Sequence, residues 1–313
     1  MDITKLIICY IISLVGKFYI IYRKTALITH NNFTAHFRKE IQVMYQINSN
    51  NPVFSLPEYQ KDKSKFHMIE LNRFAPDALI YSDEETYIIC RREGKPTWIW
   101  SADGIEEDKI DELQSVLINC FLIDDKEYKF TCKKELYEKL KEYEFPGFVG
   151  KPFEMGSLKC EELIEPKQCD GYSRIATMAD LDIIAQYRYD SAVELTPNTV
   201  NSLNAFKENT EKFIEKETFF VWENDDGKIV SIGAFKIVKS QARITHVYTP
   251  PEERCKGYAA NLIYDITDIL LNAHLQPLLY TDYNYVASNK VYKNIGYVDT
   301  GILINFNCKR PQY

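Results

Sequence analysis

The chain has 313 residues, which exceeds one typical domain and suits two domains of about 150 residues each. Hydrophobic residues make up 45% and aromatic residues 13% of the sequence, which is enough for packed cores and argues against wholesale disorder. The formal net charge of −7 argues against a broad nucleic-acid surface, which needs clustered positive charge. The acidity weakly favours a cationic or amine partner, although solubility alone explains it more simply.

The cysteine and histidine patterns argue against a metal centre. The eight cysteines form no C-x-x-C pair and no cluster with zinc-ligand spacing, and the five histidines form no H-x-x-x-H pattern. Scattered cysteines in a chain of this size are typical of reduced thiols in a cytoplasmic protein. We therefore expect no metal site and a cytoplasmic location.

The N-terminal 28 residues form a separate apolar segment. Residues 6–22 are strongly apolar but contain Lys17, which suits a membrane-spanning helix badly. Arg23 and Lys24 follow the run and would fit a short, cytoplasm-facing anchor. The segment is therefore interpreted as a buried helix or strand pair, as an extension outside the functional fold, or as a membrane anchor, and the anchor is the interpretation we favour least.

Residues 29–145 are predicted to form a first α/β domain. The change between alternating and helical spacing of apolar side chains predicts strands at 87–91, 96–101 and 127–132, and helices at 110–121 and 133–143. Periodicity breaks down over 146–171, where Pro and Gly recur, and this range is predicted to be a linker.

Residues 172–313 are predicted to form a second α/β domain with a mixed sheet. Thr177 and Asp180 have the spacing of a helix capping box. The pattern then predicts a helix at 202–216, strands at 218–223, 228–238 and 242–248, a helix at 257–273, a strand at 277–282, a helix at 286–294 and a strand at 297–306. This order excludes a simple repeat of parallel strand–helix units.

The first domain shares part of this order. Its strand, turn, helix, strand and helix over 96–143 mirror residues 242–294, but its turn reads only Ala102-Asp103-Gly104-Ile105. Two interpretations remain open: a degenerate internal duplication without phosphate-binding chemistry, or an order that any two α/β halves share.

A phosphate-binding turn is predicted between residues 254 and 259. A strand that leads through Arg254-x-x-Gly257-x-Ala259 into a helix places unpaired backbone N–H groups at a helix N-terminus, where they bind phosphate oxygens. Small residues at 257 and 259 let the pyrophosphate approach the backbone. Arg254 and Lys256 add positive charge at this turn.

The surrounding residues resemble a known family. The run from Val247 to Ala259 (VYTPPEERCKGYA) is similar to the V-Y-T-P-P-E-x-R-x-K-G-Y-A motif of GNAT acetyltransferases. Residues 279–284 (LYTDYN), 287–292 (ASNKVY) and 295–297 (IGY) resemble the last strand, helix and strand of that family. The subgroup with a glycine N-acyltransferase-like C-terminal domain is the most similar variant. The resemblance covers residues 172–306 and implies a GNAT fold there.

The resemblance also implies a coenzyme site, which would take acetyl-CoA or another short acyl-CoA. The backbones of Val247 and Thr249, with Tyr248 between them, would pair with the pantetheine arm. Asn284 and Asn289 match the family asparagines that steady the coenzyme near its thioester. The turn residues that would hold the pyrophosphate are Arg254, Cys255, Lys256, Gly257, Tyr258, Ala259 and Ala260.

The catalytic residues are less well specified. Tyr292 matches the family tyrosine that protonates the departing thiolate, although its spacing with Ile295 also suits a core residue. Many family members use a glutamate as general base, which this strand lacks, so His246 and Asp282 are the candidates. A water chain is a third route. Cys255 lies in the phosphate loop without a neighbouring base and is not expected to be a nucleophile.

The expected function is transfer of an acyl group, most simply acetyl, to an amine of a small molecule or amino acid by direct attack in a ternary complex. A non-catalytic protein that senses acyl-CoA or acts as a scaffold is the alternative, favoured by the missing glutamate. We expect a monomer or homodimer without a nucleic-acid partner, and membrane contact only if residues 1–28 are an anchor.

Overall fold

The computed structural model describes residues 45–122, 124, 126–143, 145, 147–195 and 200–310. The predicted apolar segment of residues 1–28 lies outside this range. Among the described residues, none of the helices combines the length and apolar character that crossing a membrane requires. The chain divides into two compact units: an N-terminal unit that ends at Met155 and also includes the chain from Ile302 onward, and a C-terminal unit, Gly156–Gly301.

The N-terminal unit is a mixed sheet with helices on both faces. Its strands follow the order β1-β2-β3-β4-β11, and only β3 and β4 are parallel. A core under α5 and α6 includes Ile99, Leu113 and Phe130. On the other face, Tyr59 of α3 packs edge-on against Trp100 of β3. The elements are η1 (Pro52–Ser55), α3 (Pro57–Asp62), α4 (His67–Asn72), β1 (Leu79–Ser82), β2 (Tyr87–Arg91), β3 (Thr97–Ser101), α5 (Glu107–Cys120), β4 (Glu127–Lys133), α6 (Lys134–Glu142) and β5 (Phe148–Cys160).

The C-terminal unit has strands in the order β6-β7-β8-β9-β10-β5. From β6 to β9 neighbours are antiparallel, whereas β9 and β10 are parallel and are joined through α9. Its elements are β6 (Tyr172–Ile175), η2 (Met178–Asp180), α7 (Leu181–Leu195), α8 (Leu203–Ile214), β7 (Phe219–Glu223), β8 (Ile229–Val238), β9 (Gln241–Tyr248), η4 (Pro251–Glu253), α9 (Tyr258–Asn272), β10 (Gln276–Asp282), α10 (Val286–Asn294) and β11 (Tyr297–Lys309).

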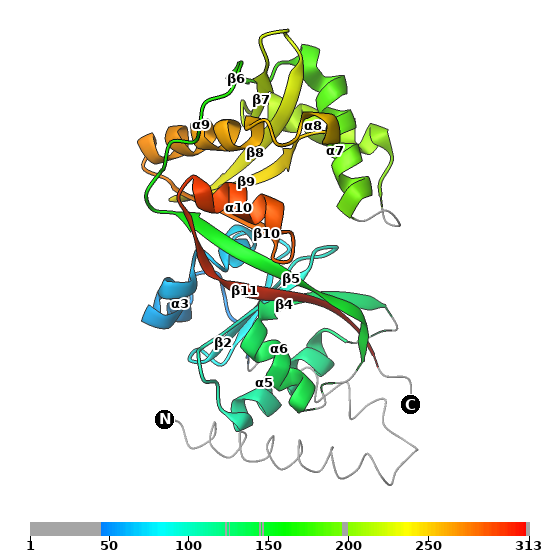
Figure 1. Cartoon of the computed structure of the whole chain (residues 1–313). Helices are drawn as coiled ribbons and strands as arrows, with labels where there is room; N and C mark the ends of the chain where they lie inside the picture. The colour runs from blue at the N-terminus through cyan, green and yellow to red at the C-terminus, as the bar shows by residue number, and fades with distance from the viewer. Residues whose placement is uncertain are drawn as a thin grey trace. The chain divides into compact units, whose positions relative to one another are not determined.

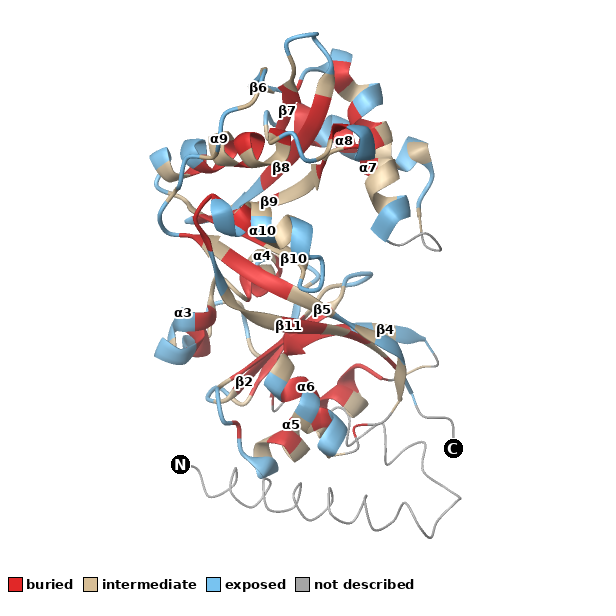
Figure 2. Ribbon diagram, in the orientation of Figure 1, coloured by how far each residue is buried: buried red, intermediate tan, exposed pale blue. Residues whose placement is uncertain are grey.

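Two cores cover opposite faces of this second sheet. Helices α7 and α8 pack Ile184 and Phe213 against one face, with Ile232 of β8 beneath them. Helices α9 and α10 pack Ile263 and Tyr292 against the other face. Figure 1 shows α9 on one side of β8 and β9 and the α7–α8 pair on the other, and Figure 2 shows the buried strand residues between them. Alternation along β9 therefore sends Ala242 and Ile244 toward α9 and Arg243 between them toward α7 and α8.

Most predicted elements form within three residues of their expected bounds. The main difference lies in the range predicted as a linker, which contains the 13-residue strand β5, Phe148–Cys160. Gly150, Pro152 and Gly156 interrupt the local strand pattern there, yet pairing with neighbouring strands outweighs local propensity. Both β5 and β11 contribute residues to each unit.

The element order occurs twice along the chain. The order α3-α4-β1-β2-β3-α5-β4-α6-β5 matches α7-α8-β7-β8-β9-α9-β10-α10-β11, with antiparallel and parallel pairs in the same places. The isolated antiparallel bridge between Gln46 and Tyr81 occupies the place that β6 has beside β7. This agreement favours internal duplication over chance, because it extends to strand direction as well as order.

Candidate active site

The parallel strands β9 and β10 are paired along only part of their lengths. Their register runs from Gln241 opposite Gln276 to Ile244 opposite Leu279 and then ends. Residues 245–248 of β9 and 280–282 of β10 continue beyond it without a shared register. The backbone N–H and C=O groups that face this divergence are therefore available to pair with another extended chain.

A β-bulge lies at the start of the divergence. Ala234 of β8 pairs with Thr245, but Ile232 pairs with Tyr248, so two residues of β9, His246 and Val247, stand opposite one residue of β8. His246 has a φ of 58°, an unusual value for a residue with a side chain. The bulge twists β9 away from regular pairing and changes the direction of the side chains that follow.

The turn after β9 forms the predicted helix N-terminus. Cys255 and Gly257 have φ of 63° and 97°, and Gly257 is the N-cap of α9. The first α9 N–H with a partner in its own helix turn is that of Asn261, which donates to the carbonyl of Gly257 at 3.1 Å. The N–H groups of Tyr258, Ala259 and Ala260 thus form the N-terminal set that can meet an anion. This turn suits a pyrophosphate.

The positive side chains of the turn are paired in this structure, which the sequence did not indicate. Arg254 donates through Nε to the carbonyl of Thr249 at 2.8 Å and through Nη2 to both oxygens of Glu194 at 2.9 and 2.8 Å. The hydroxyl of Tyr248 donates to the same carboxylate at 3.0 Å. Lys256 contacts Glu253 at 2.7 Å. Arg254 therefore links the turn to α7 and to the residue that follows β9.

Residues from α10 support the end of β10. The Nδ2 of Asn289 donates to the carbonyls of Asp282 and Tyr283 at 3.0 and 2.9 Å, and its Oδ1 is buried without a hydrogen-bond partner among the described residues. The N–H of Asn284 donates to a carboxylate oxygen of Asp282 at 2.9 Å. Asn289, Asn284 and Asp282 thus form one connected group, in which Asn289 retains an acceptor for a further partner.

Tyr292 is a buried residue of α10. Its ring packs against Tyr297 at 6.2 Å between centroids, and its hydroxyl has no hydrogen-bond partner among the described residues. Burial raises the pKa of Tyr292 to about 12, so the phenol stays protonated at neutral pH. Both predicted interpretations, core packing and proton donor, are compatible with this position.

His246 lies apart from the Asn289 group, on the α7–α8 face. Its ring is 5.1 Å from that of Phe213 and stacks on Phe219 at 6.3 Å, and its Nε2 is 3.3 Å from Nη2 of Arg188. Because guanidinium only donates, this contact directs the lone pair of Nε2 to Arg188 and places the proton on Nδ1. Desolvation and the charges of Arg188, Lys236 and Arg243 hold the pKa of His246 well below its usual value.

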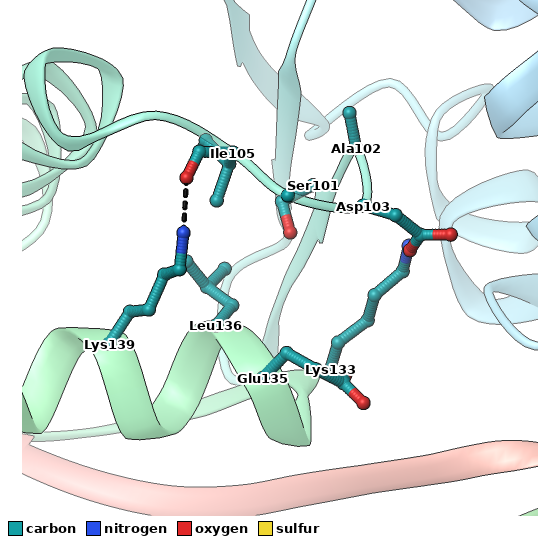
Figure 3. Close-up of a pocket in the computed structure, with 9 residues that line it drawn as sticks. Ser101, Ala102, Asp103, Ile105, Lys133, Glu135, Leu136 and Lys139 are labelled. Carbon is teal, nitrogen blue, oxygen red and sulfur yellow. Dashed lines mark hydrogen bonds and ion pairs between the residues drawn. The ribbon is translucent and has the colours of Figure 1, made fainter.

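The matching turn of the N-terminal unit has different chemistry. It borders a cavity of about 130 Å³ near Gly104 and Lys139, where Lys139 donates to the carbonyl of Ile105 (Figure 3). Lys133 is the last residue of β4 and forms ion pairs with Asp103 at 2.6 Å and Asp62 at 2.5 Å. Carboxylates and paired lysines thus occupy the place where the C-terminal unit has a helix N-terminus capped by Gly257.

Among the residues that the structure describes, no group of three or more His, Cys, Asp or Glu side chains could hold a metal ion. A mixed sheet that diverges beside a strand–turn–helix anion site is the arrangement of an acetyltransferase-type α/β fold. Residues 186–297 match the family described as Acetyltransferase (GNAT) family. The match lies within the C-terminal unit and spans the divergence of β9 and β10 and the turn before α9.

Solved structures share the fold over both units. An acetyltransferase from the GNAT family of Colwellia psychrerythraea is 14% identical, covers 90% of this chain and 98% of its own, and has a TM-score of 0.52. A GCN5-related N-acetyltransferase from Sphaerobacter thermophilus is 10% identical, covers 85% and 93%, and has a TM-score of 0.56. A Drosophila protein is 12% identical, covers 90% and 98%, and has a TM-score of 0.54. No curated protein sequence matches the chain.

Proposed function

We propose that the C-terminal unit is an acyl-CoA-dependent N-acyltransferase that transfers an acetyl group to an amine of a small molecule or amino acid. The divergence of β9 and β10 beside the α9 N-terminus carries this proposal. The divergent strands supply unpaired backbone groups for the pantetheine arm, and the α9 N-terminus beside them supplies N–H groups for the pyrophosphate. Acyl-CoA would supply the thioester, whose carbon–sulfur bond breaks as the amine nitrogen forms the amide bond.

The coenzyme-binding roles follow from these positions. Val247 lies on the part of β9 that has left its β10 partner, and Thr249 directly follows β9, so their backbones can pair with the pantetheine amides. Residues 255–260 would hold the pyrophosphate. Asn289 retains a buried acceptor near the end of β10 and can receive a hydrogen bond from the coenzyme, with Asn284 beside it.

Two proton transfers complete the reaction. The Tyr292 phenol would donate its hydrogen to the sulfur as the thiolate leaves, because it is protonated and has an unused hydroxyl. The attacking amine must also lose a proton. Asp282 or a water chain is the better candidate for this step than His246, whose Nε2 faces the Arg188 guanidinium. The backbone N–H of Val247 at the bulge would polarise the thioester carbonyl.

A binding protein without catalysis is the second candidate. The position of His246 favours it. The bulge of β9 offers no carboxylate as general base, and the Nε2 lone pair of its histidine is directed at the Arg188 guanidinium. Such a protein would bind acyl-CoA tightly and leave the thioester intact.

Thiol release distinguishes the two candidates. The full chain is mixed with acetyl-CoA and a panel of primary amines, and free thiol is followed over time while CoA binding is measured by calorimetry. We expect amine-dependent release that falls strongly in Tyr292→Phe. Tight CoA binding without release by any amine would leave only the binding protein.

A further inference from the structure

Arg243 is a half-buried cation without an acidic partner among the described residues. It lies on β9 opposite Leu278, one residue before the β9–β10 register ends. Its guanidinium forms no hydrogen bond or ion pair with the described residues, and its Nε is buried without a partner. Its contact is with the ring of Tyr280, at 5.8 Å from the guanidinium carbon to the centroid. Burying an uncompensated charge is expensive, so this arrangement requires an explanation.

A second arginine, which is more deeply buried, adds to the positive charge. Arg188 of α7 is only 7% exposed, and Nη1 and Nη2 donate to neutral oxygens of Thr210 and Asn209 at 2.7 and 2.8 Å. Its Nε has no partner among the described residues. Desolvation lowers the pKa of Arg188 to about 10, and no acidic side chain opposes that effect. Burial also lowers the pKa of Arg243. Within the described part of the chain, no acidic side chain pairs with either arginine.

The cations gather on one face of the sheet at the proposed reaction centre. Ala242 and Ile244 face α9, so alternation places Arg243 on the face that α7 and α8 cover. Lys236 lies over Phe213 at 4.8 Å on this same face. His246 feels the positive charges of all three cations, which places them around the bulge where the strands diverge. Arg188 and Lys236 thus surround the bulge, and Arg243 stands at the end of the paired register.

We propose that Arg243 binds a carboxylate of the acceptor, so that the amine substrate carries a negative group near its nucleophilic nitrogen. The terminal N–H groups of Arg243 have the fork geometry that a carboxylate accepts in two parallel bonds. Arg188 and Lys236 raise the local positive potential without needing to touch the substrate. The inference rests on the proposed function, because it names the acceptor class for the same site. Arg243 is a specificity residue and not a proton carrier.

A carboxylate could also belong to the acyl group, as in succinyl-CoA, and the experiment must separate these sources. Turnover is measured for matched amine pairs, an amino acid and its amide, with acetyl-CoA as donor and with rates corrected for the free-base fraction. A second arm uses a neutral amine with succinyl-CoA and acetyl-CoA. We expect kcat/KM to favour the carboxylated amine by about 10- to 100-fold, the range of one charge-assisted pair.

Arg243→Gln should remove this preference while leaving kcat/KM for the amide and the KM for acetyl-CoA near wild type. Arg243→Lys should restore part of it, because charge is kept but the fork is lost. Arg91→Gln is the matched control. Arg91 also lies over an aromatic ring, that of Tyr128 at 4.8 Å, but it belongs to β2 of the N-terminal unit. An unchanged preference in Arg243→Gln, or an equal loss for acid and amide, overturns the proposal. A preference for succinyl-CoA that depends on Arg243 assigns the carboxylate to the donor and also overturns it.

A binding measurement keeps the inference testable if no turnover is found. Isothermal titration of the CoA-loaded protein with an N-acetyl amino acid and with its amide asks whether the site selects a carboxylate without chemistry. Selection lost in Arg243→Gln supports the carboxylate site even if the enzyme proposal fails. Equal binding of acid and amide by the wild type rejects it.

Discussion

Replacing Gly257 with alanine tests the phosphate-binding turn most directly. Gly257 has a φ of 97°, and an added Cβ would meet the Nδ2 of Asn261 and the Cβ of Cys169 at 3.5 Å, which are ordinary contacts. The penalty is therefore conformational rather than steric, and a left-handed backbone costs an L-residue about 1–2 kcal/mol. We expect this loss of unfolding free energy in denaturant titrations.

The same substitution should weaken CoA binding more than the stability loss suggests. Relaxation of residue 257 toward negative φ would tilt the N–H groups of the first α9 turn away from a common centre. Loss of one charge-assisted hydrogen bond, about 1.5–3 kcal/mol, corresponds to about a 10- to 150-fold rise in Kd. Calorimetry should show this loss of affinity for CoA and not for pantetheine, which has no pyrophosphate.

Gly104→Ala provides the matched control. Gly104 lies in the corresponding turn of the N-terminal unit with a φ of 69°, and nothing lies within 4 Å of an added Cβ. It should have a comparable stability loss and unchanged CoA affinity. If Gly257→Ala loses stability but binds CoA as the wild type does, the turn is not the pyrophosphate site and the reasoning is wrong.

Three further substitutions test separate parts of the site. Tyr292→Phe should lower kcat by about 100-fold or more, which is the usual contribution of a positioned proton donor. Its stability should change little, because the hydroxyl has no hydrogen-bond partner among the described residues. Steady-state kinetics and thermal melts measure the two effects. His246→Asn should reduce the loss of stability on acidification. The pKa of His246 is lowered in the folded state, so its contribution to folding stability is complete above the unfolded pKa near 6.5 and is lost as the pH drops toward the folded pKa. If the unfolding midpoint of the variant falls as steeply from pH 7 to 5 as that of the wild type, this expectation is wrong. Glu194→Gln should strengthen CoA binding a few-fold at low salt by removing a carboxylate beside the turn, whereas an effect that persists at high salt would not be electrostatic.

Sequence patterns predicted the C-terminal unit well because its signals are local. Alternating apolar residues marked β7, β8 and β9, and the Gly257 turn marked the start of α9. Strand β5 was missed because Gly150 and Pro152 oppose it locally, while its stability depends on pairing with distant strands. Local periodicity contains no information about such partners.

The candidate site was predicted unevenly for a related reason. The turn is one continuous segment, so its role can be inferred from adjacent residues. Glu194 and Arg188 come from α7 and reach the site only through tertiary packing, and neither has a local motif. The surroundings of His246 likewise depend on the bulge and on the packing of α7, which is why sequence alone suggested a base where the structure places a cation beside its lone pair.

Comparison of the two units indicates which features a coenzyme site needs beyond the shared topology. Strands β3 and β4 remain paired up to Ile99 and Cys132, close to the strand ends, whereas four residues of β9, 245–248, extend beyond their β10 register. Leaving ladder groups unpaired has a free-energy cost, which a site that binds an extended ligand recovers on binding. In the N-terminal unit the ion pairs of Lys133 with Asp62 and Asp103 lie at the end of β4 instead. Grafting residues 254–259 onto that unit would therefore supply anion-binding N–H groups without the divergent strands that a pantetheine arm requires. It should not by itself create an acyl-CoA site.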